Sequence, residues 1–197
     1  MTTDSTRAFL ERLPDGLASY RECQAKISVI HAWVDGHDLD ELAARLPAEI
    51  DMAAILRQPA TAWVSEVEAT AIYLTVRDVF FDSDDAYVRG AHTKNVNLLR
   101  NPLYRVLARL FSAERIQKAG SAIFARLHRG IRSIPERRGD ELFWTLEYPP
   151  HLVPELIARC YGTALAAALE LSGSPAVPIE IDTHTPTRTV LRVKPVW

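Results

Sequence analysis

The pattern of apolar and polar positions in the last third of the chain predicts a strand, a long helix and a hairpin. Residues 141–148 and the two halves of 177–197 have the composition of strands. Residues 152–171 carry two adjacent rows of apolar or small side chains at helical spacing. Rows of this kind form a broad apolar stripe that faces a core. We therefore predict that this helix crosses a small antiparallel sheet.

The first two thirds of the chain are predicted to be mainly helical. Capping patterns at Asp38 and Ser65, each followed by a glutamate three residues later, open two helices. Further helices are predicted over residues 5–13, 51–57, 82–88, 101–110 and 112–131. The segment 25–35 is rich in β-branched residues, which favours a strand over the competing helix.

These elements indicate an α+β fold, in which a helical N-terminal layer packs on a small antiparallel sheet crossed by a long C-terminal helix. A predicted loop at residues 135–140 separates the mainly helical part, 1–134, from the strand–helix–hairpin part, 139–197. The sequence contains no repeat, low-complexity tract or flexible linker. We therefore expect residues 1–197 to form a single domain.

Composition limits the classes of partner. The 197 residues carry a formal net charge of −2, which predicts no bulk affinity for nucleic acid or membrane. No apolar run approaches the roughly 20 residues that span a bilayer, and the N-terminal segment does not resemble a secretory signal. Cys23 and Cys160 lie far apart and outside any CxxC spacing, which favours a reduced, cytoplasmic environment, although pairing between them stays open.

Basic residues are concentrated between positions 100 and 138, a segment that contains ten arginines and lysines but only two glutamates. Such a segment predicts a surface that binds an acidic protein or nucleic acid. The candidate contacts are Arg105, Arg109, Arg126, Arg129 and Arg132. The competing interpretation is a solvated surface that neutralises acidic helices of the same fold. Because aromatic residues do not alternate with the arginines, nucleic acid is the less favoured partner.

The sequence shows no motif for catalysis or metal binding. Its six histidines have no HxxxH spacing, and there is no cysteine cluster. No GxSxG elbow or glycine-rich phosphate loop is present. Cys160 lies within the apolar stripe, where a thiol acts as a small hydrophobe, so a catalytic Cys–His pair is the less favoured alternative. We expect a protein that is not an enzyme and holds no metal.

Several segments resemble known families. WTLEYP, the helix RCYGTALAAALELSG and the closing hairpin resemble the ligand-binding fold shared by 4-vinyl-reductase-like, TRAPP-like and haem–nitric-oxide-binding domains. The chain more closely resembles an uncharacterised myxobacterial family with a tryptophan at a helix start, as at Trp63, and a YRxL-type segment, as at 104–107. A His/Arg-Gly helix end, here 128–130, and a terminal Trp197 complete the pattern, which covers residues 20–197.

The resemblance implies a fold and a pocket, since no activity is established for the myxobacterial family. In the better-known relatives a ligand pocket lies between the helices and the sheet, and two copies often pair through their helices. A homodimer is therefore expected. The lining residues that the resemblance implies are Trp63, Tyr104, Trp144, Cys160 and Tyr161.

Two departures from the relatives bear on cofactors. The final hairpin lacks the metal-holding cysteines of many 4-vinyl-reductase-like domains. Haem–nitric-oxide-binding domains use a histidine in an LxxLH-like helical context and a YxSxR motif for the haem propionates. Residues 124–128 resemble the first motif, with His128 as the histidine, but residues 144–148 lack the serine and arginine of the second. We therefore expect no cofactor.

Three functions are compatible with these observations. The leading interpretation is a non-enzymatic regulatory or sensory module that binds a small apolar ligand or a protein partner. The alternative is an interaction module that uses the basic segment 100–138 to bind an acidic protein or nucleic acid. A haem-based gas sensor that uses His128 is the third.

Overall fold

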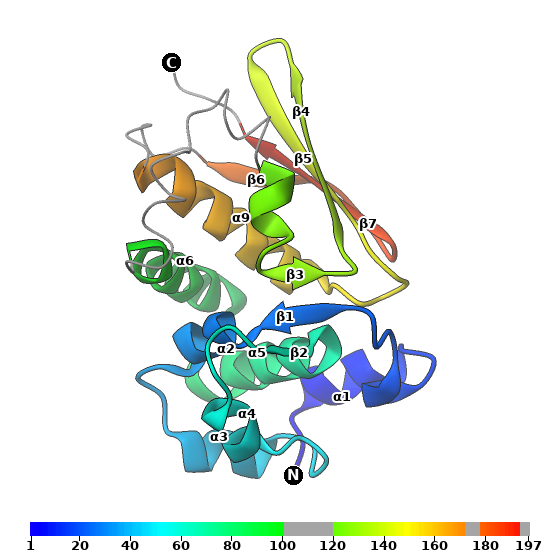
Figure 1. Cartoon of the computed structure of the whole chain (residues 1–197), viewed down its shortest axis with the longest axis vertical. Helices are drawn as coiled ribbons and strands as arrows, with labels where there is room; N and C mark the ends of the chain where they lie inside the picture. The colour runs from blue at the N-terminus through cyan, green and yellow to red at the C-terminus, as the bar shows by residue number, and fades with distance from the viewer. Residues whose placement is uncertain (101–119, 172–177, 194–197) are drawn as a thin grey trace.

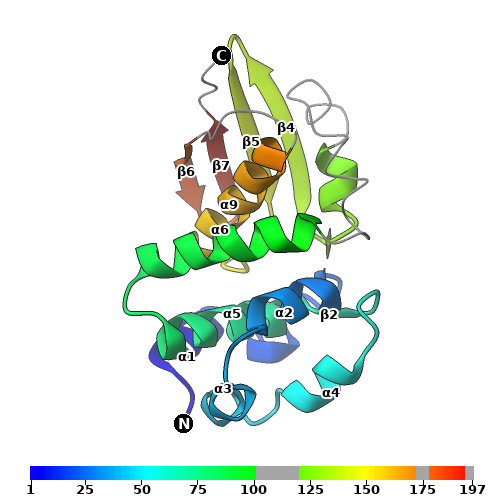
Figure 2. The same cartoon turned by 90° about the vertical axis from the view of Figure 1, so that its left-hand side faces the viewer.

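The computed structural model describes residues 1–100, 120–171 and 178–193, which form two lobes with a long helix between them (Figure 1). We call residues 4–80 the helical lobe and residues 132–193 the sheet lobe. Helix α6 (Asp84–Arg100) runs across the molecule between the lobes, as Figure 2 shows. It packs against helices of both lobes, so it joins them into one structure.

The helical lobe is built around one buried helix. Its helices are α1 (Asp4–Glu11), α2 (Ile27–Val34), α3 (Leu39–Arg45), α4 (Met52–Arg57) and α5 (Glu66–Phe80), with a 3-10 turn at Gly16–Ala18. Helices α3 and α5 begin where the capping patterns predicted. The Asp38 side chain accepts hydrogen bonds from two backbone N–H groups, and Ser65 accepts one from the N–H of Val67. Helix α5 is buried along most of its length, and α1 and α3 pack on it.

Three short antiparallel strands lie on the side of the helical lobe that faces the sheet lobe. They are β1 (Gln24–Lys26), β2 (Trp63–Ser65) and β3 (His128–Arg129), in the order β2-β1-β3. Strand β3 belongs to the segment that follows α6. The pairing of Ala25 with His128 therefore attaches that segment to the helical lobe.

The sheet lobe is a four-stranded antiparallel sheet crossed by one helix. Its strands are β4 (Arg132–Arg138), β5 (Glu141–Glu147), β6 (Ile179–Thr185) and β7 (Arg188–Val193), in the order β4-β5-β7-β6. Helix α9 (Glu155–Leu171) lies on the face that carries Trp144 and Leu191. Gly162 permits a close approach, because a Cβ there would lie 3.3 Å from a methyl carbon of Ile179. This arrangement confirms the predicted α+β fold with a long helix across an antiparallel sheet.

Three local predictions were wrong. Most of the segment 25–35 is helix α2 rather than a strand, since only residues 24–26 pair in a sheet. The helix predicted to end at residue 131 ends earlier, and residues 128–129 form β3. The predicted loop 135–140 is instead the second half of β4 and a tight turn, in which Gly139 has φ +61°. Residues 128–129 follow their pairing with the distant β1, residues 135–138 follow their pairing with β5, and in α2 the β-branched composition does not prevent a helix.

Within the described ranges, none of the helices is long and apolar enough to cross a membrane. The predicted helix over 101–110 and the first part of the predicted helix 112–131 lie outside the described residues.

Candidate functional site

An apolar cavity of about 80 Å³ lies where α6, α9, the sheet and the segment before β3 meet. We call it the α9 cavity. Its described lining residues are Asn95, Leu98, Leu99, Ile123, Phe124, Leu127, His128, Trp144, Leu146, Tyr161, Ala164, Leu165, Ala168 and Leu191. Only Asn95, His128, Trp144 and Tyr161 among these carry a polar side-chain atom. The cavity is therefore a mainly apolar site with a few polar groups, as small-molecule sites usually are.

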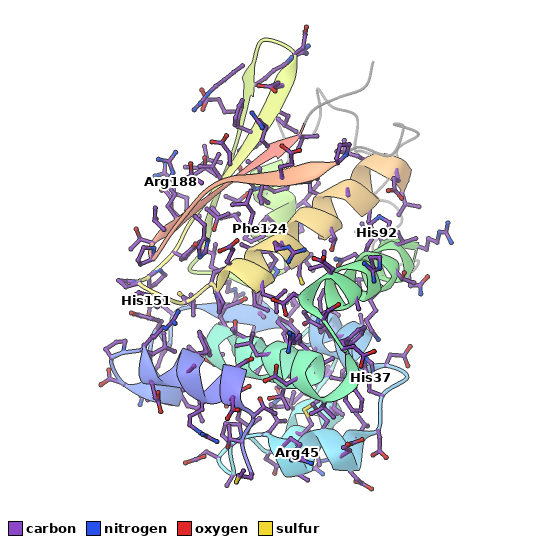
Figure 3. All side chains as sticks on the ribbon, turned by 180° about the vertical axis from the view of Figure 1, so that it is seen from behind. His37, Arg45, His92, Phe124, His151 and Arg188 are labelled. Carbon is purple, nitrogen blue, oxygen red and sulfur yellow. The ribbon has the colours of Figure 1, made fainter. Side chains whose placement is uncertain are left out.

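Aromatic rings form one end of this cavity. Phe124, which is labelled in Figure 3, stacks on the ring of His128 with centroids 4.7 Å apart. Its edge contacts Trp144 and Tyr161 at centroid distances of 6.3 and 5.8 Å. The indole N–H of Trp144 donates a hydrogen bond of 2.6 Å to Oγ of Ser133. The ring of Tyr161 lies edge-on to the imidazole at a centroid distance of 5.1 Å, so His128 lies between two aromatic neighbours.

A buried carboxylate lies directly behind His128. The Glu66 side chain is fully buried, and Nδ1 of His128 lies 3.1 Å from its Oε2 and 3.3 Å from its Oε1. The hydroxyl of Tyr161 donates a hydrogen bond of 2.6 Å to Oε1 of the same carboxylate. Burial, and then the charge of Glu66, raise the pKa of Tyr161 well above its ordinary value, so the phenol keeps its proton.

Local sequence explains how these three residues meet. Ser65 caps α5, which makes Glu66 the first residue of the helix, where the helix dipole favours a negative charge. Gly130 has φ +76°, and its backbone packs against Cys23 of the chain leading into β1. This close contact fixes the position of β3 and therefore of His128. Tyr161 reaches the pair from the middle of α9.

Only two of the five residues expected to line a pocket are found among the described residues of the α9 cavity wall. Trp144 and Tyr161 lie together on the wall of the α9 cavity. Trp63 lies in β2, away from that wall, and its ring contacts the cationic ends of Lys26 and Arg129, each 3.8 Å from the ring centroid. Tyr104 lies outside the described residues.

Cys160 is buried one position before Tyr161 and is not among the cavity-lining residues. Burial raises the pKa of its thiol above the ordinary value. Suppressed ionisation makes a cysteine a poor nucleophile, so its role is packing.

The basic segment is only partly described. Arg126 is exposed, Arg129 lies over Trp63, and Arg132 forms an ion pair of 3.2 Å with Glu147 of β5. Arg105 and Arg109 lie outside the described residues. The partner of Arg132 comes from a strand beyond the segment, which shows how a local excess of arginines is partly neutralised within the fold.

Sequence reasoning missed Glu66 as a functional residue. The capping pattern drew attention to Glu68 instead, two residues later. A usable signal was the spacing of Glu66, Thr70 and Tyr73, which places three polar side chains on one face of a buried helix. The hydroxyl oxygens of Thr70 and Tyr73 are buried and have no hydrogen-bond partner among the described residues.

Comparison with known proteins identifies the fold. No protein-family model matches the chain, and no curated protein matches it. An H-NOX protein from S. oneidensis in the Fe(II)NO ligation state is 11% identical, with a TM-score of 0.61, and the match covers 86% of this chain and 98% of that one. An unliganded Fe(II) H-NOX protein from K. algicida is 8% identical, with a TM-score of 0.58 and coverage of 87% and 97%. An oxygen-binding H-NOX domain related to soluble guanylate cyclases is 9% identical, with a TM-score of 0.54 and coverage of 86% and 94%.

Two functional expectations are corrected by these matches. The leading interpretation, a module without haem that binds an apolar ligand or a partner, was wrong, and so was the expectation of no cofactor. The structures that share this fold include H-NOX proteins described in Fe(II), Fe(II)NO and oxygen-bound states. A further structure with this fold concerns haem redox potential and porphyrin distortion. At 8–13% identity they establish architecture, and the chain has the α+β fold of H-NOX domains.

Proposed function

We propose that this chain is a haem-dependent gas-sensing domain, with haem bound at the α9 cavity and His128 as its axial ligand. The observation that carries the proposal is a histidine on the wall of an apolar cavity whose Nδ1 is held by a buried carboxylate. Metal-binding histidines usually have this second contact, which orients the ring and leaves Nε2 for the metal. The haem named for a structure with the same fold supports haem as the cofactor.

The donor chemistry of the described residues fits haem. A proximal histidine is one of the few protein ligands of haem iron, and apolar walls suit the porphyrin face. Among the described lining residues, His128 is the only histidine, and there is no cysteine, methionine or aspartate. Tyr161 is the other side chain there that is known as a haem ligand, but its hydroxyl is already bound to Glu66.

Size and charge set the conditions under which haem binds. The partly open cavity of about 80 Å³ is smaller than the roughly 300–1,000 Å³ of typical ligand pockets. We therefore propose that its walls move apart when haem binds. No arginine or lysine is present among the described lining residues, so the propionates take partners outside that set. This agrees with the missing YxSxR motif of strand β5.

The chain's own residues have three tasks in this proposal. His128 supplies the ligand atom, Phe124 holds the imidazole plane by stacking, and the leucines of α6 and α9 exclude water. Haem, when bound, supplies an iron atom that takes a diatomic gas. Because His128 also belongs to β3, its position is coupled to the helical lobe through β1.

The proposal extends to the setting of the sensor. A sensor acts on a partner rather than on a substrate, so we propose a non-enzymatic protein with a protein partner, for which the exposed Arg126 is a candidate contact. A cytoplasmic location is supported by two free, buried cysteines. From the sequence resemblance we also propose that the chain belongs to the myxobacterial family and forms a homodimer.

A spectroscopic titration tests the function. Ferric haem is added to the purified chain, to His128→Leu and to His92→Leu, a control whose histidine pairs with Glu170 outside the cavity. We expect saturable binding at one haem per chain, with a protein-specific Soret band, in the first and third proteins and its loss in His128→Leu. After reduction, nitric oxide should change the spectrum. Absence of saturable binding by the unmodified chain would refute the proposal.

A further inference from the structure

Burial of the Glu66 side chain is unfavourable for the free energy of folding. Burying a carboxylate costs several kcal/mol unless hydrogen bonds and charge compensate it, and apolar substitutes are often as stable. Its compensation comes from the N-terminus of α5, from Nδ1 of His128 and from the hydroxyl of Tyr161. Glu66 contacts His128, the one histidine among the described residues that line the cavity. Because burial of this carboxylate is unfavourable, its position indicates a functional role beyond stability.

The donors around the carboxylate fix the direction of its hydrogen bonds. The Tyr161 hydroxyl donates to Oε1 of Glu66, and Nδ1 of His128 is placed to donate to the same carboxylate. An imidazole that donates through Nδ1–H keeps its lone pair on Nε2. Strong acceptance by Glu66 pulls the Nδ1 proton away from the ring and makes Nε2 a better electron donor.

We propose that Glu66 is a positioning residue that sets the donor strength of His128, and that Tyr161 moderates it. This inference rests on the proposed function. Glu66 draws the imidazole toward imidazolate character, which favours the ferric over the ferrous state of a haem held at Nε2. Tyr161 shares the same carboxylate, so its hydrogen bond withdraws charge from Glu66 and weakens the effect.

The two residues therefore have opposite predicted effects. Glu66→Gln keeps the shape of the side chain but removes its charge, so it should shift the ferric/ferrous midpoint potential to more positive values. Tyr161→Phe removes a competing donor from the carboxylate, so it should shift the potential to more negative values. A purely structural role would loosen the site in both variants and would not give shifts of opposite sign.

Two readouts accompany the potential. Ferric haem binding should weaken by about 10- to 100-fold in Glu66→Gln, the usual effect of losing an outer partner of a metal-bound histidine. In the haem-free chain, nitrogen-15 NMR of the His128 ring should show a protonated Nδ1 that is strongly hydrogen-bonded, and this signature should weaken in Glu66→Gln. Glu68→Gln, two residues along α5, is the matched control and should leave both readouts unchanged.

The outcomes separate the two proposals. If the unmodified chain binds no haem, both the function and this inference are overturned. If it binds haem through His128 but the two variants shift the potential in the same direction or not at all, the function stands and the inference is overturned. Opposite shifts with an unchanged Glu68→Gln control support it.

Discussion

Gly130 lies so close to Cys23 that a Cβ on the glycine would be 2.5 Å from Sγ and 2.8 Å from Cα of the cysteine. Real Cβ atoms essentially never make contacts of that length, so any side chain at this position would force its surroundings to shift. Gly130 follows β3 directly and also has φ +76°. The segment that carries His128 is therefore anchored to the helical lobe by a backbone contact that no side chain could replace.

The first prediction concerns this contact. Gly130→Ala and Gly139→Ala both place alanine at positive φ, which costs about 1–2 kcal/mol. Nothing lies within 4 Å of a Cβ at Gly139. Gly130→Ala should therefore lose about a further 1–3 kcal/mol of unfolding free energy from overpacking. Urea denaturation of both variants measures the difference, and equal losses would show that the contact is not tight.

A second prediction concerns the size of the α9 cavity. Ala168 lines the cavity, and Ala166 of the same helix faces a different depression, beside β6. Ala168→Leu should fill the space, weaken ferric haem binding at least tenfold and keep or raise the unfolding free energy by roughly 0.5–2 kcal/mol. Ala166→Leu is the control and should bind haem normally. Unchanged haem affinity in Ala168→Leu would place the ligand elsewhere.

A third prediction concerns acid sensitivity. His37 stacks on Phe80 at a centroid distance of 4.5 Å, and burial, with Lys94 adding to it, lowers its pKa below the ordinary value. The unfolded chain therefore takes up this proton at higher pH than the folded chain does. The stability that depends on neutral His37 is complete above the unfolded pKa of about 6.5 and is lost as the pH falls through the folded pKa.

The measurement is the unfolding free energy at about pH 7.5 and about pH 5.5. The unfolding free energy of the unmodified chain should decrease from the higher to the lower pH. The decrease should be smaller in His37→Phe, which keeps the stacking but cannot be protonated. Burial also lowers the pKa of His184, so part of the decline should remain. An undiminished decline in His37→Phe would exclude His37 as its source.

Much of the fold could be predicted from the sequence because its signals are local. Asp38 and Ser65 mark helix starts through side-chain caps that involve residues two or three positions away. The apolar stripe of α9 and the strands beside it are also encoded within short windows. These features require no knowledge of the rest of the chain.

The candidate site could not be predicted in the same way because its partners are distant in sequence. Glu66 and His128 are 62 positions apart, and Tyr161 is 95 positions from Glu66. The segment before β4 was predicted as helix because its apolar spacing is helical, yet residues 128–129 pair with β1. The haem motif of the relatives is missing from β5, which led us to expect no cofactor. His128 could be named as a possible haem ligand from the sequence, but only the three-dimensional structure reveals that the carboxylate of Glu66 holds its ring.

Ligand rescue at position 128 tests directly whether His128 holds the haem iron. His128→Gly removes the proposed axial ligand and leaves space for free imidazole in its place. We predict that this variant binds ferric haem weakly and that added imidazole restores the Soret spectrum of the unmodified protein, whereas His92→Gly needs no rescue. If His128→Gly binds haem without imidazole, and with the spectrum and affinity of the unmodified protein, His128 is not the ligand of the haem iron.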